Sequence, residues 1–243
     1  MGKTLYEYEA KVRYNEIDEQ GRLTVPALLD LFQNASGFQS EELGFGIEYL
    51  ENRKEAWVLS SWQICINKMP FFAQKVRVQT WPYSFRRALG NRNYRILDEQ
   101  GNTLACADSF WAYVSTEDHM IRKFPPEMID AYGTLPELEM EKAPRKIALP
   151  DNMRAEEPFE VKYYFIDTNH HMNNAKYILA ASEYLPGEFT VKEVRAEYKK
   201  SAMLGDTVYP FVSAEKDCVT VSMCDAAGEV YAIVQFIKKL SSL

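Results

Sequence analysis

A short polar segment, residues 167–174, concentrates side chains that could act together in acid–base chemistry. Two of the chain's three histidines lie in it, together with one aspartate and three asparagines. Histidine exchanges a proton near neutral pH, and an imidazole beside carboxylate and amide groups suits general-base catalysis. The segment therefore predicts a site for hydrolysis or proton transfer.

Each of these residues also has a purely structural interpretation. Asn173 or Asn174 could cap the helix that follows, and His170 is expected on the surface. Asp167 could stabilise the turn, because the first half has an aspartate, Asp18, at the corresponding place. Adjacent histidines without a distant Cys or His lack the spacing of a metal site, so neither a metal nor a cofactor is predicted.

The polar segment lies where a predicted strand, residues 159–165, passes into a predicted helix that begins near Asn173. Tyr177, Ala181 and Tyr184 recur at helical spacing and define the buried face of that helix. Alternating apolar residues predict four strands after it, at residues 190–201, 207–214, 219–224 and 230–237. A strand-to-helix junction is therefore expected to position the candidate site.

The first half of the chain repeats this order of elements. A strand over residues 6–14 precedes a long helix. Thr24 is the expected cap of this helix, Pro26 fits its first turn, and Gly44 suits the position just past its end. Its apolar face is expected to hold Leu28, Leu31, Phe32, Ala35 and Phe38. Four strands are predicted after it, at residues 56–67, 75–85, 91–97 and 103–115.

Matching turn residues indicate that the two halves are copies of one unit. Asp18 falls on Asp167 at an offset of 149 (167 − 18). The hairpin turn that begins at Asp98 falls on the one at Asp225 at an offset of 127 (225 − 98), and insertions in the first half explain the difference. A shared order of elements together with shared turn residues favours duplication over chance similarity.

The two copies differ at the polar segment. The first half has Arg22 where the second has His171. The second copy is therefore predicted to keep the site, whereas the first copy keeps only the fold.

The chain is accordingly expected to form an N-terminal module, residues 1–116, and a C-terminal module, residues 158–243. The connector between them, residues 117–157, holds five prolines. Residues 126–132 of the connector could form a short helix that stops at Gly133.

Composition and charge restrict the class of protein. Hydrophobic residues make up 47% of the chain, which favours a packed core, and a net charge of −7 argues against nucleic-acid binding. Nothing in the sequence resembles a secretory leader, and no apolar run approaches the roughly 20 residues that span a bilayer, so a soluble, cytoplasmic protein without a membrane partner is expected. Four cysteines without C-x-x-C spacing are expected to be buried free thiols.

The pattern Asp-x-Asn-x-His-x-Asn-Asn-x-Lys-Tyr, residues 167–177, resembles the active-site motif of the acyl-acyl-carrier-protein thioesterases, here of the bacterial type. Glu197-Tyr198-Lys199-Lys200 is similar to the family's second motif, Glu-Tyr-Arg-Arg-Glu-Cys. Members of the family are double hot-dog enzymes. The resemblance spans nearly the whole chain and implies an α+β, tandem hot-dog fold, in which an antiparallel sheet wraps around central helices.

The resemblance also implies roles in catalysis. Asp167, Asn169 and His171 fall on the family's catalytic aspartate, asparagine and histidine. His171 would take a proton from water, Asp167 would orient the imidazole or polarise the water, and Asn169 would hold the water or the substrate carbonyl. Backbone N–H groups at the helix start, around Asn173 and Asn174, would stabilise the developing oxyanion.

One departure from the family pattern concerns the end of the second motif. Where the plant enzymes have Glu-Cys, this chain has Ser201-Ala202. A mechanism with that cysteine as nucleophile is therefore excluded, and Ser201 is expected to be a supporting residue at most.

The implied substrate is a fatty acyl chain on the phosphopantetheine arm of acyl carrier protein, released as free fatty acid in fatty acid biosynthesis. The degenerate N-terminal module would hold the acyl chain. Because the carrier is strongly acidic, the enzyme should offer a basic patch, for which Arg86 with Arg87, and separately Lys199 with Lys200, are the candidates. Fusion of two hot-dog units is also compatible with a homodimer.

Three other functions share parts of this pattern. An acyl-coenzyme A thioesterase cleaves the same thioester on a different carrier. Hot-dog hydratases set aspartate and histidine five residues apart, whereas Asp167 and His171 are four apart (171 − 167), so a dehydratase or hydratase is less favoured. A module that only binds the acyl carrier needs no imidazole.

Overall fold

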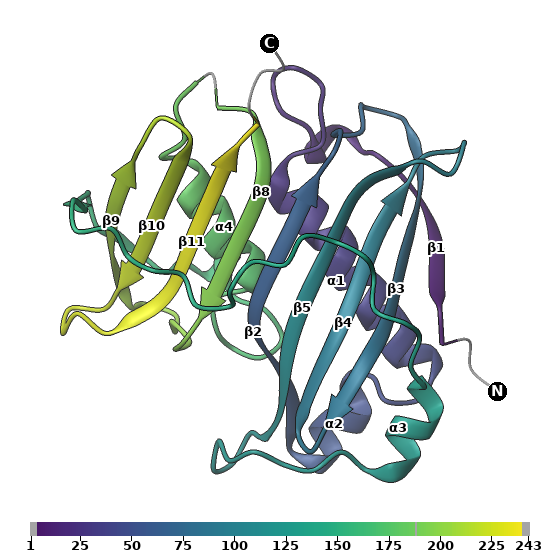
Figure 1. The fold of residues 1–243 in the computed structure, drawn as a ribbon. Coiled ribbons are helices and arrows are strands. Elements are labelled where there is room, and N and C mark those ends of the chain that lie inside the picture. The colour runs from purple at the N-terminus through teal and green to yellow at the C-terminus, as the bar shows by residue number, and fades with distance from the viewer. Residues whose placement is uncertain (1–3, 188, 240–243) are drawn as a thin grey trace. The chain divides into compact units, whose positions relative to one another are not determined.

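The computed structural model describes residues 4–187 and 189–239, which divide into two compact units. The first unit comprises Met1–Ser60 and Ile66–Glu141, and the second comprises Ser61–Cys65 and Lys142–Leu243. In each unit a helix lies against an antiparallel sheet (Figure 1). None of the helices in the described ranges is long and apolar enough to cross a membrane.

The first unit is built on an antiparallel sheet with the strand order β1-β3-β4-β5-β2. Its strands are β1 (Tyr6–Lys11), β2 (Glu55–Ile66), β3 (Lys75–Arg86), β4 (Leu89–Leu97) and β5 (Thr103–Ser115). Helix α1 (Val25–Glu42) lies behind this sheet in Figure 1 and contacts β1 and β3. The four strands predicted after the helix are confirmed to within two residues at either end.

Local signals define both ends of α1. The hydroxyl of Thr24 accepts a hydrogen bond from the N–H of Ala27 (3.3 Å), and Gly44 beyond the last turn has a φ of +78°. The predicted apolar face is buried at four of its five positions, but Phe38 is 45% exposed. The prediction for Phe38 was wrong because helical spacing does not reveal where the sheet ends. Its ring instead packs edge-on against Tyr8.

Both strands that open the two halves are shorter than predicted. β1 ends at Lys11, and β7 (Phe159–Glu160) has only two residues. In each half the remainder turns into a short 3₁₀ helix, Tyr14–Glu16 or Tyr163–Phe165. The alternation of apolar and polar residues continues through both 3₁₀ helices. Their first residues, Tyr14 and Tyr163, are 80% and 81% exposed, so the alternation there does not indicate burial in a sheet.

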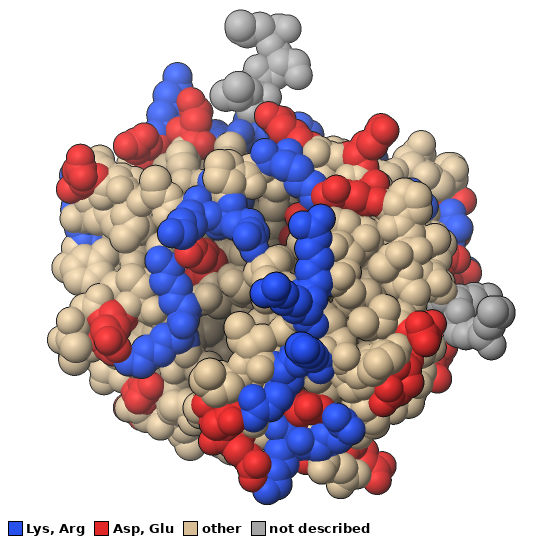
Figure 2. All heavy atoms as spheres, turned by 60° about the horizontal axis from the view of Figure 1, so that its bottom comes forward, with Lys and Arg blue, Asp and Glu red and all other residues tan. Residues whose placement is uncertain are grey.

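Two further helices close one end of the first unit. The connector forms α3 (Pro126–Tyr132), as predicted, and it ends at Gly133, which has a φ of +59°. Helix α2 (Ile47–Arg53) was not predicted. Both helices surround an aromatic cluster, whose buried members are Phe45, Tyr113, Phe124, Met128 and Tyr132. Figure 2 brings this end forward and shows Lys and Arg side chains gathered on it.

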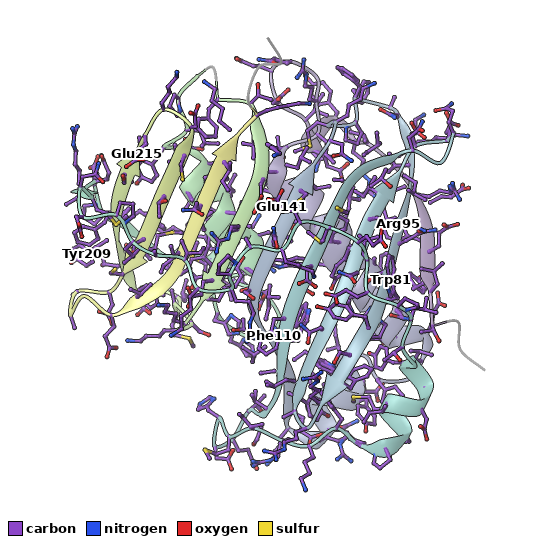
Figure 3. The ribbon with its side chains drawn as sticks, viewed as in Figure 1. Trp81, Arg95, Phe110, Glu141, Tyr209 and Glu215 are labelled. Carbon is purple, nitrogen blue, oxygen red and sulfur yellow. The ribbon has the colours of Figure 1, made fainter. Side chains whose placement is uncertain are left out.

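The connector beyond α3 crosses the face of the first sheet that α1 does not cover (Figure 1). The indole N–H of Trp81 donates to the carbonyl of Pro136 (2.9 Å), and the N–H of Leu138 donates to the side chain of Asn93 (2.9 Å). Arg95 stacks over the Trp81 ring at 5.5 Å, and Figure 3 shows both side chains beside the connector. The connector as far as Glu141 is therefore an ordered part of this unit.

The second unit has a smaller antiparallel sheet with the order β8-β11-β10-β9-β6, in which β7 also pairs with β9. Residues 61–65 of β2 pair with β8. The strands are β6 (Arg154–Ala155), β8 (Val191–Tyr198), β9 (Thr207–Ala214), β10 (Cys218–Cys224) and β11 (Val230–Lys238). Helix α4 (Asn174–Ser182) buries Tyr177 and Ala181, whereas Tyr184 lies beyond its end and is only half-buried.

The duplicated hairpin turns match at the level of single hydrogen bonds. One carboxylate oxygen of Asp98 accepts from two backbone N–H groups of its turn, and Asp225 does the same in the second unit. Gly101 and Gly228 have φ values of +86° and +83°, which explains the glycine in both turns. The duplication inferred from the sequence is therefore visible in backbone geometry.

The four cysteines, all within the described ranges, are not joined in disulfides, and they are less buried than predicted. Cys224 is buried, whereas Cys65, Cys106 and Cys218 are half-buried. Alternate side chains of a strand face opposite sides of the sheet, and these three lie at positions that the core does not fully cover.

The contrast between Phe32 and Phe38 on α1 gives a test of where the core lies. Phe32 is fully buried, with its ring centroid 5.2 Å from that of Tyr94. Phe32→Ala should lower the free energy of unfolding by about 3–5 kcal/mol, because it leaves a cavity. Phe38→Ala should lower it by less than about 1 kcal/mol. Urea unfolding measures both, and equal losses would contradict this description of the core.

Candidate active site

Residues 166–172 form a tight hairpin that leads into α4. Ile166 and Met172 form an isolated antiparallel bridge, and the N–H of Asp167 donates to the carbonyl of His171 (3.1 Å). At the tip, His170 is exposed and has a φ of +62°, a conformation that few residues with a side chain adopt. His170 is therefore a turn residue on the surface, as predicted.

Both carboxylate oxygens of Asp167 accept hydrogen bonds within this hairpin. Oδ1 accepts from the backbone N–H of Asn169 (2.9 Å), and Oδ2 accepts from the side-chain amide of Asn173 (3.2 Å). The sequence left the turn and catalytic interpretations of Asp167 open. The hydrogen bonds make it the residue that joins the hairpin to the start of α4.

Asn173 is the cap of α4. Its side-chain oxygen accepts from the N–H of Ala175 (2.8 Å), and its own N–H donates to the carbonyl of Phe165 (2.8 Å). Of the three N–H groups from Asn173 to Ala175, two are therefore already used within the protein. Of these three groups, only the N–H of Asn174 has no acceptor among the described residues, so it is available to a ligand.

His171 is half-buried on the arm of the hairpin that returns toward α4. Its Nδ1 lies 3.4 Å from the carbonyl oxygen of Met172. Among the residues described, no hydrogen bond joins its ring to Asp167 or Asn169, and Asn169 is exposed. The structure thus places the three predicted residues on one hairpin without linking their side chains directly.

The loop after β8 lies beside the arm of the hairpin that carries His171. His171 forms an isolated bridge with Met203, and the N–H of Met172 donates to the carbonyl of Ala202 (2.8 Å). Ser201, at the position of the family glutamate, is exposed on this loop. The second motif is therefore brought to the histidine by backbone pairing.

Two tyrosines, buried Tyr177 and half-buried Tyr198, fix the helix start and this loop. The phenol oxygen of Tyr177 accepts from the N–H of Ala202 (2.9 Å), and the hydroxyl of Tyr198 donates to the carbonyl of Asn174 (2.9 Å). Burial raises the pKa of Tyr177 to about 12, so its phenol stays neutral. Sequence reasoning placed Tyr177 on a buried helix face and Tyr198 in the second motif but missed their hydroxyl partners, because these contacts join segments far apart in the chain.

The first unit contains the same hairpin without the histidine. Asp18 accepts from the N–H groups of Gln20 and Arg22 (2.9 Å each), and Arg22 forms a bridge with Phe71. The guanidinium of Arg22 lies over the Phe71 ring, with 5.7 Å to its centroid. The framework is thus retained in both copies, whereas only the second carries an imidazole.

The two predicted basic patches differ in how their charges are used. Lys200 forms ion pairs with Asp225 (2.6 Å) and Glu229 (2.7 Å), which raise its pKa, and Lys199 lies 3.6 Å from Glu197. Arg86 and Arg87 are exposed at the turn between β3 and β4.

Comparison with known proteins identifies the class to which this fold and hairpin belong. A family model described as the acyl-ACP thioesterase N-terminal domain matches residues 3–132, and one described as the C-terminal domain matches residues 149–234. The chain therefore belongs to the acyl-ACP thioesterase family, and its fold is a tandem hot-dog fold.

Individual relatives are distant in sequence. A chloroplastic acyl-[acyl-carrier-protein] hydrolase of Cuphea viscosissima is 26% identical over 84% of this chain and 53% of its own length. A chloroplastic oleoyl-acyl carrier protein thioesterase of Coriandrum sativum is 22% identical over 87% of this chain and 63% of its own length. The chain thus spans about half to two thirds of the length of these two relatives.

Two solved structures resemble the whole chain. An acyl-ACP thioesterase from Bacteroides thetaiotaomicron superimposes with a TM-score of 0.88 at 25% identity, covering 97% of this chain and 98% of that one. A 12:0-ACP thioesterase from Umbellularia californica gives a TM-score of 0.86 at 16% identity, covering 98% of each chain, which is evidence for the fold alone.

The different roles of Asn173 and Asn174 can be separated by mutation. Asn173→Ala removes the cap and a partner of Asp167, so the free energy of unfolding should fall by about 1–2 kcal/mol. Asn174→Ala is the matched control and should change it by less than about 0.5 kcal/mol, since only its backbone is used. Thermal or urea unfolding measures both, and equal destabilisation would contradict the assignment of Asn173 as the cap.

Proposed function

We propose that this protein hydrolyses the thioester of fatty acyl chains carried by acyl carrier protein and releases the free fatty acid. The observation that carries the proposal is the position of His171. Its half-buried imidazole lies on a hairpin held beside the second motif, in a chain that belongs to the acyl-ACP thioesterase family.

His171 acts as the general base. Its Nδ1 lies 3.4 Å from the carbonyl oxygen of Met172, which would accept a hydrogen bond from a proton assigned to Nδ1, and in that tautomer Nε2 takes the proton from water. The water oxygen then attacks the thioester carbonyl carbon and the carbon–sulfur bond breaks. The proton held by His171 passes to the leaving sulfur, so the products are the fatty acid and the carrier thiol.

Asp167 and Asn169 have different roles in this proposal. Because both oxygens of Asp167 accept hydrogen bonds inside the hairpin, it positions the loop and does not act as a second base. The exposed amide of Asn169 is available to hold the attacking water or the substrate carbonyl.

The developing oxyanion is stabilised by the N–H of Asn174. This group lies at the start of α4, where the helix dipole also favours negative charge, and its neighbours already have acceptors in the protein. Ser201, exposed on the loop that pairs with the hairpin, is a supporting residue.

The acyl chain is proposed to bind in the first unit. A groove of about 610 Å³ lies there between β1 and α1, within the size range of ligand pockets. Its apolar lining includes Leu31, Phe38 and Phe72. In this proposal the exposed ring of Phe38 is a wall of the groove.

The proposed function is tested by following thiol release from acyl carrier thioesters and from the matching coenzyme A thioesters. His171→Ala should lower turnover by about 10²–10⁴-fold without changing the fold, because the general base is lost. His170→Ala, at the exposed turn, is the control and should retain activity. Near-normal turnover by His171→Ala, or release from neither substrate by the unaltered protein, would overturn the proposal.

The oxyanion donor can be removed without altering the helix. Asn174→Pro deletes the N–H, and proline is well tolerated at the first position of a helix. The preceding Asn173 has φ −60° and ψ 141°, which suits a residue before proline. Turnover should fall by about 10²–10³-fold.

Asn174→Ala is the control for this change, because it keeps the N–H and should retain most activity. Steady-state kinetics measures the turnover of both variants, and thermal unfolding checks that their stabilities match. Similar turnover by the proline and alanine variants would rule out the N–H as a donor.

A further inference from the structure

The first copy of the hot-dog unit is enlarged at one end. From Asp18 to Asp98 the chain advances 80 residues (98 − 18), whereas from Asp167 to Asp225 it advances 58 (225 − 167). The additional residues lengthen β3 and β4 and include α2. Because the connector also adds α3 there, this end is a structure that the second unit lacks.

The charge of this end differs from that of its counterpart. The turn between β3 and β4 carries Arg86 and Arg87. The corresponding turn of the second unit, between β9 and β10, is Glu215-Lys216-Asp217, and Figure 3 labels Glu215 there. Arg87 pairs through its carbonyl with the N–H of Phe124 (3.3 Å), which brings exposed Lys123 next to the turn. We name Arg86, Arg87 and Lys123 the basic tip.

The basic tip carries positive charge that the protein itself does not neutralise. Three other cations at this end are already paired, as Arg53–Glu55, Lys54–Glu117 and Arg122–Asp118. Within the described ranges, none of the three basic-tip residues has a carboxylate partner. Their charges are therefore available to an acidic ligand.

The basic tip is also held rigidly. The ring of Phe85, just before Arg86, packs against Phe124 with 5.2 Å between centroids. The N–H of Tyr113 donates to the carbonyl of Ala88 (2.8 Å), the second residue of the turn, and both are buried. Because the aromatic cluster packs against this turn, the turn loses little conformational freedom on binding, which favours its use as a docking surface.

The Lys199–Lys200 patch lacks these properties. Lys200 is held between Asp225 and Glu229, and Lys199 is near Glu197. These lysines stabilise the hairpin between β10 and β11 and the end of β8, and an acidic partner would have to compete with carboxylates already in place.

We propose that the basic tip is the docking surface for the acidic acyl carrier protein, and that Lys199 and Lys200 do not contribute to docking. This inference rests on the proposed function for the identity of the partner. Because the whole chain has a net charge of −7, an acidic partner is repelled at long range, so attraction has to come from a local surplus of cations.

The proposal is tested with the double variant Arg86→Glu/Arg87→Glu. Its KM for the carrier-bound thioester should rise about tenfold or more at low salt with little change in kcat, because encounter and docking weaken while the catalytic hairpin is unaltered. Its kinetics with the same acyl group on coenzyme A or on pantetheine should not change. Lys68→Glu/Lys75→Glu reverses two exposed cations elsewhere in the first unit and is the control for overall charge.

Three kinetic results would overturn the inference. An unchanged KM for the carrier thioester would exclude the basic tip. An equal rise with the control variant would assign the effect to overall charge. An equal rise with the coenzyme A thioester would indicate that the basic tip binds nucleotide phosphates.

A binding measurement separates this inference from the proposed function. In a His171→Ala background, carrier protein without an acyl chain should bind, binding should weaken with salt, and Arg86→Glu/Arg87→Glu should abolish it. That result would support docking even if no hydrolysis were found. Retained binding by this variant, with loss of binding to anionic vesicles instead, would show that the basic tip meets a membrane and would contradict the proposal.

Discussion

The candidate site depends on the carboxylate of Asp167. One of its oxygens accepts from the backbone of Asn169, and the other accepts from the amide of Asn173, which in turn caps α4. This chain of hydrogen bonds ties the hairpin to the start of α4, where the N–H of Asn174 has no acceptor among the described residues. The positions of His171 and of that N–H relative to each other thus depend on a single side chain, that of Asp167.

The duplicated hairpin separates this framework from the chemistry that it supports. Asp18 accepts the bond from Gln20 that corresponds to the one from Asn169 to Asp167, and a second one from the N–H of Arg22, so the turn also forms in the copy without the imidazole. What the first copy lacks is the imidazole, and Arg22 at that position lies over Phe71 instead. The hydrogen bonds that hold the turn come from Asp18 and from the backbone, so the turn forms with either residue at this position. One copy can therefore lose its imidazole without unfolding.

The parts of the structure that the sequence predicts are those governed by local rules. Thr24 and Gly44 bound α1, and the aspartates of the two hairpin turns act on their own backbone, so their roles do not depend on distant residues. The exposure of Phe38 was not predicted, and the opening strands end three and five residues before their predicted ends (14 − 11 and 165 − 160), because burial depends on what packs above these residues. The use of Lys200 as an internal ion pair was likewise hidden, since Asp225 is brought to it only by the pairing of β8 with β11 and of β11 with β10.

Because the chain contains two copies of the unit, one copy can provide the docking surface for a carrier-bound substrate and the other can provide the site of hydrolysis. Docking needs unpaired cations on a rigid surface, whereas hydrolysis needs an imidazole beside a free N–H and few competing charges. In a pair of identical subunits, each change at the turn between β3 and β4 would appear in both copies. In this fused chain that turn is Arg86-Arg87 in the first unit while its counterpart contains Glu215 and Asp217. The surplus of positive charge that the docking proposal requires is therefore present at only one of the two turns, in the copy that lacks the histidine.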